Sequence, residues 1–265
     1  MTTRDADAPT FDAAASGSTE QSIENLAEDV LRALEEVGFC VVTSVLPHDA
    51  VAEMRELVEL LLHAEPQNRH HTGHQRVLHL AAKHAAFHRA LLDPLALAVW
   101  RRFLSPDVIC STFTANALWP GATEFYWHAD HPYWTLTPPW PSMPLTGQNI
   151  WFLDEFTIEN GATAGIPGSH RRGALPPYED RSVEGSMVLT GPPGSVIFAH
   201  GAWWHTSRPN TTDALRCALL ATYTHTFCVP QEEMRLQLDA IDEPGDALRR
   251  ILGGDQYRPQ RNFPY

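Results

Sequence analysis

The sequence predicts a mainly β fold with flanking helices, built on a β-sandwich or jelly-roll barrel. Helical periodicity is confined to the first third of the chain. After residue 108, short segments rich in Val, Ile, Phe, Trp and Thr alternate with turns such as WPGA, ENGA, IPGSH and GPPGS. About seven short strands that follow a helical region are typical of a two-sheet fold with that helical third packed on one sheet.

The 265 residues are enough for one domain with a single core, which we expect over residues 21–265. Residues 1–20 are rich in Ala, Ser, Thr, Asp and Gly and contain few large apolar side chains. Because such a segment buries little apolar surface to offset its loss of entropy, the sequence predicts a disordered tail there.

Apolar residues spaced three and four apart predict a helix over residues 22–37, which Gly38 ends. The segment FCVVTSVL that follows is typical of a strand. Similar spacing predicts a second helix from about Asp49 to Leu62 and a third over residues 94–104. The strand candidates after them are residues 108–118, 123–129, 149–156, 162–166, 186–189, 195–198 and 216–227.

The composition favours a small-molecule partner. Against 32 acidic residues the chain has 19 Lys and Arg residues, and the net charge of -13 argues against a nucleic-acid or anionic-membrane surface. The sequence has no apolar run of membrane-spanning length and no secretory signal, so we expect a cytoplasmic protein. Four cysteines without a C-x-x-C pair indicate buried thiols, and a homo-oligomer stays possible.

The stretch YWHADHPYW, residues 126–134, concentrates metal-binding side chains among aromatic ones. On an extended strand, side chains two positions apart point to the same face, so His128 and Asp130 can converge on one atom. His131 would fall on the other side or in the turn. A third ligand must come from elsewhere, and His200 and His205 compete for that place. A His, carboxylate and His set with open positions is the arrangement of non-haem Fe(II) oxygenases.

Three segments carry a family resemblance: WHAD at 127–130, LDEFTIENGATAGIPGSH at 153–170, and GSVIFAHGAWWHTSRPNTTDALR at 194–216. In this order they resemble the phytanoyl-CoA dioxygenase (PhyH-like) family of Fe(II)- and 2-oxoglutarate-dependent oxygenases. The resemblance implies a double-stranded β-helix core of the jelly-roll or cupin-like kind. In that family an Asn and an Arg follow the distal histidine, which selects His205, with Asn210 and Arg216 after it.

The resemblance also implies the cofactors and their residues. Fe(II) would be bound by His128, Asp130 and His205, and 2-oxoglutarate and O2 would be consumed to give succinate and CO2. The presence of Asp130 argues against the halogenating relatives, so hydroxylation is the expected outcome, with desaturation, epoxidation and ring formation left open. The expected cosubstrate contacts are Arg216, Thr163, Thr206 and Ser207.

Arg216 also stands out on its own, because it opens the apolar run RCALLATY. A guanidinium at the edge of a core strand needs an anionic partner. The far carboxylate of 2-oxoglutarate would serve, and so would an internal Asp or Glu.

The Pro-rich stretch 132–147 predicts a loop long enough to be a lid over the metal site. Aromatic residues in it and just before it are expected to contact an apolar or aromatic substrate: Tyr126, Tyr133, Trp134 and Trp140. The histidine-rich run 70–88 is more typical of a polar surface or pocket rim than of a second metal tract, and Arg76 or His79 is a candidate to reach the site.

The sequence therefore predicts an Fe(II)/2-oxoglutarate dioxygenase that oxidises a small, largely apolar or aromatic metabolite or natural-product intermediate. A single lysine and the negative charge argue against a CoA substrate. Two alternatives stay open: a catalytically silent jelly-roll binding protein, and a cupin-type metalloenzyme that does not use 2-oxoglutarate.

Overall fold

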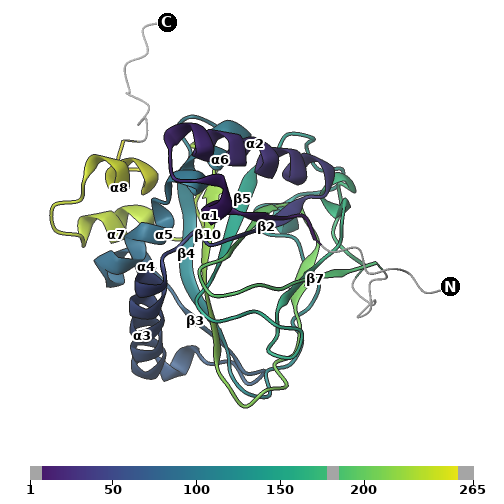
Figure 1. Ribbon diagram of the computed structural model, residues 1–265, viewed down its shortest axis with the longest axis vertical. Helices are drawn as coiled ribbons and strands as arrows, with labels where there is room; N and C mark the ends of the chain where they lie inside the picture. Colours follow the sequence, from purple (N-terminus) through teal and green to yellow (C-terminus); the bar gives the residue numbers. More distant parts are fainter. Residues whose placement is uncertain (1–7, 178–184, 256–265) are drawn as a thin grey trace, which may run out of the picture.

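A computed structural model of the protein describes residues 8–177 and 185–255. A seven-stranded sheet in the order β1-β2-β8-β5-β10-β4-β3 runs through its centre, and a three-stranded sheet in the order β7-β6-β9 lies to one side (Figure 1). The large sheet comprises β1 Thr10–Asp12, β2 Phe39–Thr43, β3 His74–Val77, β4 Ile109–Leu118, β5 Thr146–Phe152, β8 Val196–His200 and β10 Arg216–Thr224. The small sheet comprises β6 Thr163–Gly165, β7 Met187–Leu189 and β9 His205–Ser207.

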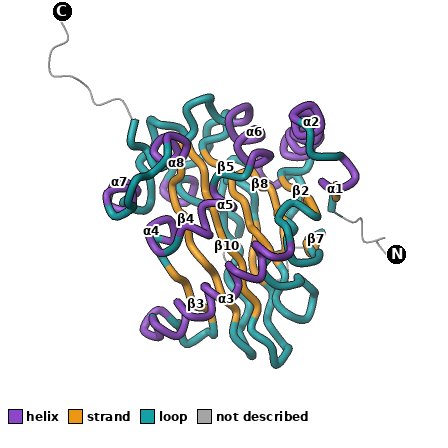
Figure 2. The backbone as a smooth tube through the Cα atoms, turned by 60° about the vertical axis from the view of Figure 1, so that its left-hand side comes forward, coloured by secondary structure: helices purple, strands orange, loops and turns teal. Residues whose placement is uncertain are grey.

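The helices cover the side of the large sheet that faces away from the small one (Figures 1 and 2). The long ones are α2 Glu20–Glu36, α3 His48–Ala64 and α6 Pro94–Phe103. The shorter ones are α1 Ala13–Ser16, α4 Leu80–Lys83, α5 His88–Leu91, α7 Met234–Asp239 and α8 Asp246–Ile251, with 3-10 turns η1 Pro66–Asn68, η2 Ala85–Phe87, η3 Tyr133–Thr135 and η4 Ser169–Arg171. The predicted helical layer on one sheet is therefore confirmed.

The strands of the large sheet separate two environments by the alternation of their side chains. In β10, the odd-numbered residues from Cys217 to Tyr223 belong to the main hydrophobic core beneath the helices. Ala218 and Leu220 face the other way, into a second apolar cluster between the sheets. At Ser111 the pairing of β4 with β10 shifts by one residue, which a β-bulge explains. The cavity described below lies on the face opposite the helices.

The helix predictions at 22–37, 49–62 and 94–104 match α2, α3 and α6, and most strand predictions match a strand. Residues 123–129 are the exception, because they form no regular strand and contribute a single bridge from His128 to His205. Sequence periodicity missed β3, β9, α7 and α8, since three to six residues are too few to show a period.

The disordered tail predicted for residues 1–20 is wrong over its described part, which begins at Ala8. There β1 pairs in parallel with β2, and Phe11 packs against the main core. The side chain of Thr19 then caps α2 by accepting a hydrogen bond from the backbone N–H of Ser22. The composition of this segment did not reveal its order, because the order comes from one aromatic side chain, Phe11, and from pairing with the edge of the sheet. Residues 1–7 lie outside the described part of the chain.

Across residues 8–177 and 185–255, no helix combines the length and apolar character needed to span a bilayer.

Candidate metal centre

His128, Asp130 and His205 come together in space although 77 positions separate the two histidines. The backbones of His128 and His205 exchange two hydrogen bonds of 3.0 and 2.9 Å, which place the two imidazoles side by side with ring centroids 4.1 Å apart. The backbone N–H of Asp130 donates to the carbonyl of Gly201, and its Oδ1 lies 3.8 Å from His205 Nε2. One ligand atom from each of the three residues lies within 4.8 Å of the others.

Each imidazole is oriented by a backbone carbonyl two residues earlier. His128 Nδ1 lies 3.0 Å from the oxygen of Tyr126, and His205 Nδ1 lies 3.4 Å from the oxygen of Trp203. A neutral imidazole that donates from Nδ1 keeps the Nε2 lone pair free, as a metal ligand requires. The ring of Trp203 stacks on His205 at 4.3 Å and fixes its plane.

The environment favours uncharged histidines. Burial lowers the pKa of His128 to about 3, with a further contribution from His205, and burial likewise lowers the pKa of His205 to about 3. Burial also raises the pKa of Asp130, which His128 partly offsets. The buried Oδ2 of Asp130 has no hydrogen-bond partner among the described residues. Two neutral imidazoles and a carboxylate with a free oxygen fit a divalent iron site.

The two other histidines of these motifs stay outside the cluster. His200 ends β8, where its Nδ1 accepts a hydrogen bond from the backbone N–H of Ala202, and its ring packs against Phe103 of α6. His131 takes no part in the cluster either. Of the two candidates for the third ligand, the geometry therefore selects His205.

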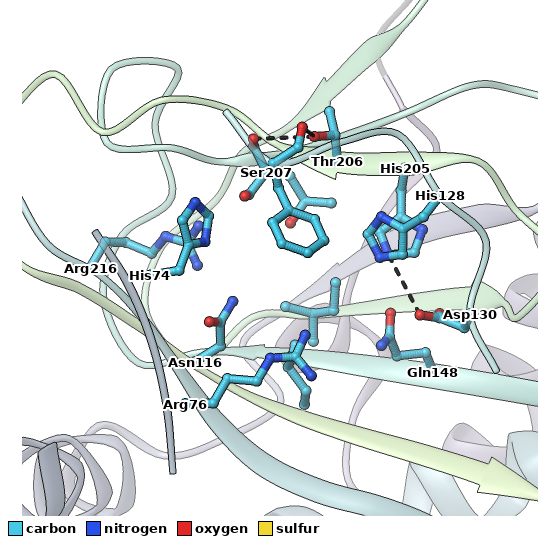
Figure 3. A pocket seen from close by; sticks show the side chains of 14 residues that line it. His74, Arg76, Asn116, His128, Asp130, Gln148, His205, Thr206, Ser207 and Arg216 are labelled. Atoms are coloured by element: carbon cyan, nitrogen blue, oxygen red, sulfur yellow. Dashed lines mark hydrogen bonds and ion pairs between the residues drawn. The ribbon is translucent and has the colours of Figure 1, made fainter. Parts of the chain in front are cut away.

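The three residues open onto a cavity of about 80 Å³ that reaches to Arg216 (Figure 3). The predicted cosubstrate contacts Thr163, Thr206, Ser207 and Arg216 all line it. Thr163 pairs with Ser207 across the small sheet, and the hydroxyl of Thr206 donates to the carbonyl of Phe125. Asn210 lies in the turn before β10, where its side-chain amide donates to the carbonyls of Leu118 and Ala214.

Arg216 is only 2% exposed and forms no ion pair with any residue that the structure describes. It donates one hydrogen bond to the carbonyl of Gly161, its guanidinium lies 4.2 Å from the ring centroid of Phe156, and its Nε has no partner. Asp154, an acid whose charge acts on Arg216, is itself held by Arg55 and by the backbone N–H of Cys217. Burial lowers the pKa of Arg216 to about 9. Because Asp154 is engaged elsewhere, the Arg216 guanidinium is available to bind an anion in the cavity.

A second cavity of about 170 Å³ is lined by two of the three residues, His128 and Asp130. Tyr126 and Trp134, two of the predicted substrate contacts, line it and are 55% and 44% exposed. The sequence named Arg76 or His79 as the residue of the 70–88 run that reaches the site. Arg76 lines both cavities. His79 lines neither cavity, and its backbone N–H bonds to Glu232.

The substrate contacts predicted for Tyr133 and Trp140 are contradicted by their burial. Tyr133 is 0% and Trp140 is 7% exposed, and the two rings pack together at 5.0 Å in an apolar cluster with Leu145 and Trp204. The hydroxyl of Tyr133 accepts a hydrogen bond from the backbone N–H of Leu145. These two rings pack inside the 132–147 segment. Of the three aromatic residues predicted there as substrate contacts, only Trp134 lines a cavity beside His128 and Asp130.

Sequence reasoning missed the contribution of the large sheet to these cavities. The polar residues that project from it are His74 of β3, Thr112 and Asn116 of β4, Gln148 of β5 and Thr222 of β10. The alternating letters T-F-T-A-N at 112–116 carry the signal of a strand with one polar face. The strand predicted at 149–156 begins one residue after Gln148, which left that residue out.

The model of the phytanoyl-CoA dioxygenase (PhyH) family matches residues 34–218. This chain belongs to that family. The family fits the observed fold, a double-stranded β-helix with flanking helices, and makes the protein a non-haem iron oxygenase that uses Fe(II), 2-oxoglutarate and O2.

Among curated relatives, Dioxygenase andF of Emericella variicolor is 26% identical over 244 residues, which are 85% of this chain and 84% of the relative. Dioxygenase af480 of Aspergillus fumigatus is 31% identical over 149 residues, 56% of this chain and 47% of the relative, so the match spans just under half of that protein. Among solved structures, HygX from Streptomyces hygroscopicus, with nickel, 2-oxoglutarate and hygromycin B bound, superposes with a TM-score of 0.64 at 18% identity, covering 76% of this chain and 88% of HygX.

Proposed function

We propose that this family member hydroxylates a small, largely apolar or aromatic molecule, a metabolite or natural-product intermediate, with His128, Asp130 and His205 as the iron ligands. One observation carries the proposal: three clustered metal-ligand candidates and a buried arginine that has no ion-pair partner among the described residues open onto the same cavity. When bound there, iron with 2-oxoglutarate and O2 supplies the oxidising chemistry, and the cosubstrate leaves as succinate and CO2.

The residues of the chain bind and orient the cosubstrate. Arg216 pairs with its far carboxylate, since a charge-assisted hydrogen bond in a buried site is stronger than one in water. The hydroxyls of Thr163 and Ser207 lie on the same cavity wall and supply further hydrogen bonds. Thr206 contributes less as a donor, because its hydroxyl hydrogen is held by Phe125.

Arg76 is a second cation on the wall of the same cavity. No hydrogen bond or ion pair of its side chain with another described residue is present, and Asp130 contributes to its electrostatic environment. The side chain is accessible although protein surrounds it, which is expected of a group that projects into a cavity. Arg216 at one end and Arg76 near the metal ligands thus match the two carboxylates of 2-oxoglutarate (Figure 3).

The substrate lies in the second cavity. Tyr126 and Trp134 offer exposed aromatic surface at its rim, next to His128 and Asp130. Aromatic faces of this kind bind apolar or aromatic groups, and burying them excludes water from the metal ligands. The C–H bond to be oxidised then lies between these rings and the pair His128 and Asp130.

An anaerobic titration tests the metal and cosubstrate sites. Addition of Fe(II) and 2-oxoglutarate is expected to produce a weak visible charge-transfer band, which His205→Ala abolishes. The matched control is His131→Gln, since His131 lies beside Asp130 but outside the cluster, and this variant should keep the band. Metal-loaded wild type without a band would instead favour a metalloenzyme that does not use 2-oxoglutarate. Succinate release that depends on an added substrate separates an enzyme from a silent binding protein.

A further inference from the structure

The floor of the second cavity is a row of uncharged polar side chains that crosses three adjacent strands. Thr222 of β10 pairs with Thr112 of β4 on one side and with Gln148 of β5 on the other. Paired residues of neighbouring strands project to the same face, so the three side chains form one line, about 10 Å long at two strand spacings. All three line this cavity together with Asp130, so the row lies next to the metal ligands.

Gln148 is the member of the row that points most directly to a ligand. It is 6% exposed, its buried Oε1 has no hydrogen-bond partner, and its amide makes no hydrogen bond within the described part of the chain. Buried polar groups are almost always bonded, and leaving one unmet costs about 1–3 kcal/mol. Figure 3 shows this amide directed toward Asp130 and the interior of the cavity.

The neighbouring residue, Asn149, is an amide whose hydrogen bonds are met within the fold. Asn149 projects from the opposite face of β5, where its Oδ1 accepts a 2.7 Å hydrogen bond from Trp100 Nε1 and its Nδ2 donates to the carbonyl of Ile197. Gln148, on the other face of the same strand, lines the cavities instead. The unmet amide therefore belongs to whatever the cavity binds.

The chemistry of the row indicates which group it binds. Thr112 and Thr222 share one hydrogen bond of 3.3 Å, so their oxygens keep acceptor sites and one hydroxyl hydrogen stays available. No member of the row is charged. A hydroxyl or amide group both donates and accepts, so it would satisfy Gln148 and the threonines together, whereas a carboxylate cannot donate to the unmet Oε1.

Building on the proposed function, we propose that Thr112, Thr222 and Gln148 determine specificity by binding an uncharged hydroxyl or amide group of the substrate. The apolar or aromatic part of the same molecule then contacts Tyr126 and Trp134. Gln148 lines both cavities, whereas Thr112 and Thr222 line the second cavity and not the one that reaches Arg216. The two threonines therefore assign the row to the substrate rather than to 2-oxoglutarate.

Binding of matched probes tests the assignment without turnover. The protein is loaded with Zn(II) in place of iron and with 2-oxoglutarate, and dissociation constants of indane, 1-indanol and indane-1-carboxylate are measured by ligand-observed NMR. Wild type should bind the alcohol about tenfold more tightly than the hydrocarbon, which corresponds to one net hydrogen bond of about 1.4 kcal/mol. The carboxylate should gain no such advantage.

Gln148→Met keeps the length of the side chain and removes its hydrogen bonds, so the preference for the alcohol should fall to about twofold or less. Thr222→Val should reduce the preference for the alcohol in part, and this variant replaces Gln148→Met as the test if Gln148→Met is unstable. Gln21→Met, on α2 across the sheet, is the matched control and should keep the wild-type preference. Equal binding of alcohol and hydrocarbon by wild type, or no measurable binding of the alcohol, would overturn the assignment.

The affinity for 2-oxoglutarate, measured in the same samples, separates this inference from the function on which it rests. Wild type that fails to bind 2-oxoglutarate contradicts the proposed function itself. Intact 2-oxoglutarate binding without a preference for the alcohol contradicts only the role of the row. If Gln148→Met weakens 2-oxoglutarate binding and leaves the preference intact, the amide serves the cosubstrate and the inference is wrong.

Discussion

The two faces of the seven-stranded sheet consist of alternate residues of the same strands, and both carry apolar clusters, yet one of them also opens onto the two cavities. The face beneath the helices carries large apolar groups such as Leu219 and Tyr223, which are fully packed. The cavity face of the same strand carries Arg216 and Thr222, whose side chains line the two cavities. The contrast indicates that stability resides mainly on one face and ligand binding on the other, so substitutions should separate the two properties.

The largest expected effect comes from the helix face. Trp100 of α6 is 0% exposed, packs against Phe198 and Tyr223, and donates a hydrogen bond to Asn149. Trp100→Ala should lower the free energy of unfolding by about 3–5 kcal/mol, measured by urea denaturation. The dissociation constant for 2-oxoglutarate of the remaining folded protein should change less than twofold.

The exposed Leu60 of α3 provides the control for this comparison, and Leu60→Ala should change stability by less than about 0.5 kcal/mol. A Trp100→Ala protein that stays folded but loses 2-oxoglutarate binding would show that the two faces are coupled.

On the cavity face, Arg216→Gln should weaken 2-oxoglutarate binding and leave the free energy of unfolding nearly unchanged or higher. Loss of the charge-assisted hydrogen bonds to a carboxylate, about 1.5–3 kcal/mol, should raise the dissociation constant for 2-oxoglutarate about 10- to 100-fold. Stability should stay the same or rise, because a buried cation without an ion-pair partner is removed. Arg171→Gln is the control: Arg171 bonds the carbonyl of Glu35 at the surface, and its loss should leave the affinity unchanged. An unchanged affinity in Arg216→Gln would separate this arginine from the cosubstrate.

His200 is a polar exception on the helix face, and it should make stability depend on pH. It is 8% exposed, and burial lowers its pKa to about 3 from the ordinary 6.5. A lowered pKa means that the folded state favours the neutral ring, so the contribution is complete above pH 6.5 and is lost as pH falls toward 3. Between pH 7 and pH 5 the loss amounts to about 2 kcal/mol.

His200→Asn should remove that part of the acid sensitivity, measured as the difference in unfolding free energy between pH 7 and pH 5 in metal-free protein. The metal ligands titrate in both proteins, so their contribution cancels in the comparison. Identical pH dependence in wild type and variant would mean that His200 is not the neutral, buried group described above.

The contrast between the faces also explains what the sequence could predict. His128, Asp130, His205 and Arg216 could be predicted as candidates because a metal site and a buried cation restrict residue type strongly at few positions, and the structure brings the four to one cavity. Gln148, Thr112 and Thr222 were not predicted, since hydrogen-bonding side chains on a strand are common. Only the tertiary structure shows that the Gln148 amide lacks a partner among the described residues.

The prediction that Tyr133 and Trp140 contact substrate was wrong, because an aromatic residue in a loop can pack inward as readily as outward. The segment 123–129 failed as a strand because extended backbone without regular pairing has the same sequence pattern as a strand. Local pattern therefore identified the chemistry, whereas the orientation of uncharged side chains depended on packing between distant segments.

The smallest expected effect concerns Thr114, which shares the cavity side of β4 with Thr112 but lines neither cavity and is 2% exposed. Its hydroxyl has no hydrogen-bond partner among the residues that the structure describes, and Val has the same shape without the polar group. Thr114→Val should raise the free energy of unfolding by up to about 1 kcal/mol, measured in urea, and leave 2-oxoglutarate affinity unchanged. Thr112→Val should instead weaken alcohol binding, so comparison of the two variants would locate the edge of the binding surface on this face. Destabilisation by Thr114→Val would show that the Thr114 hydroxyl has a partner.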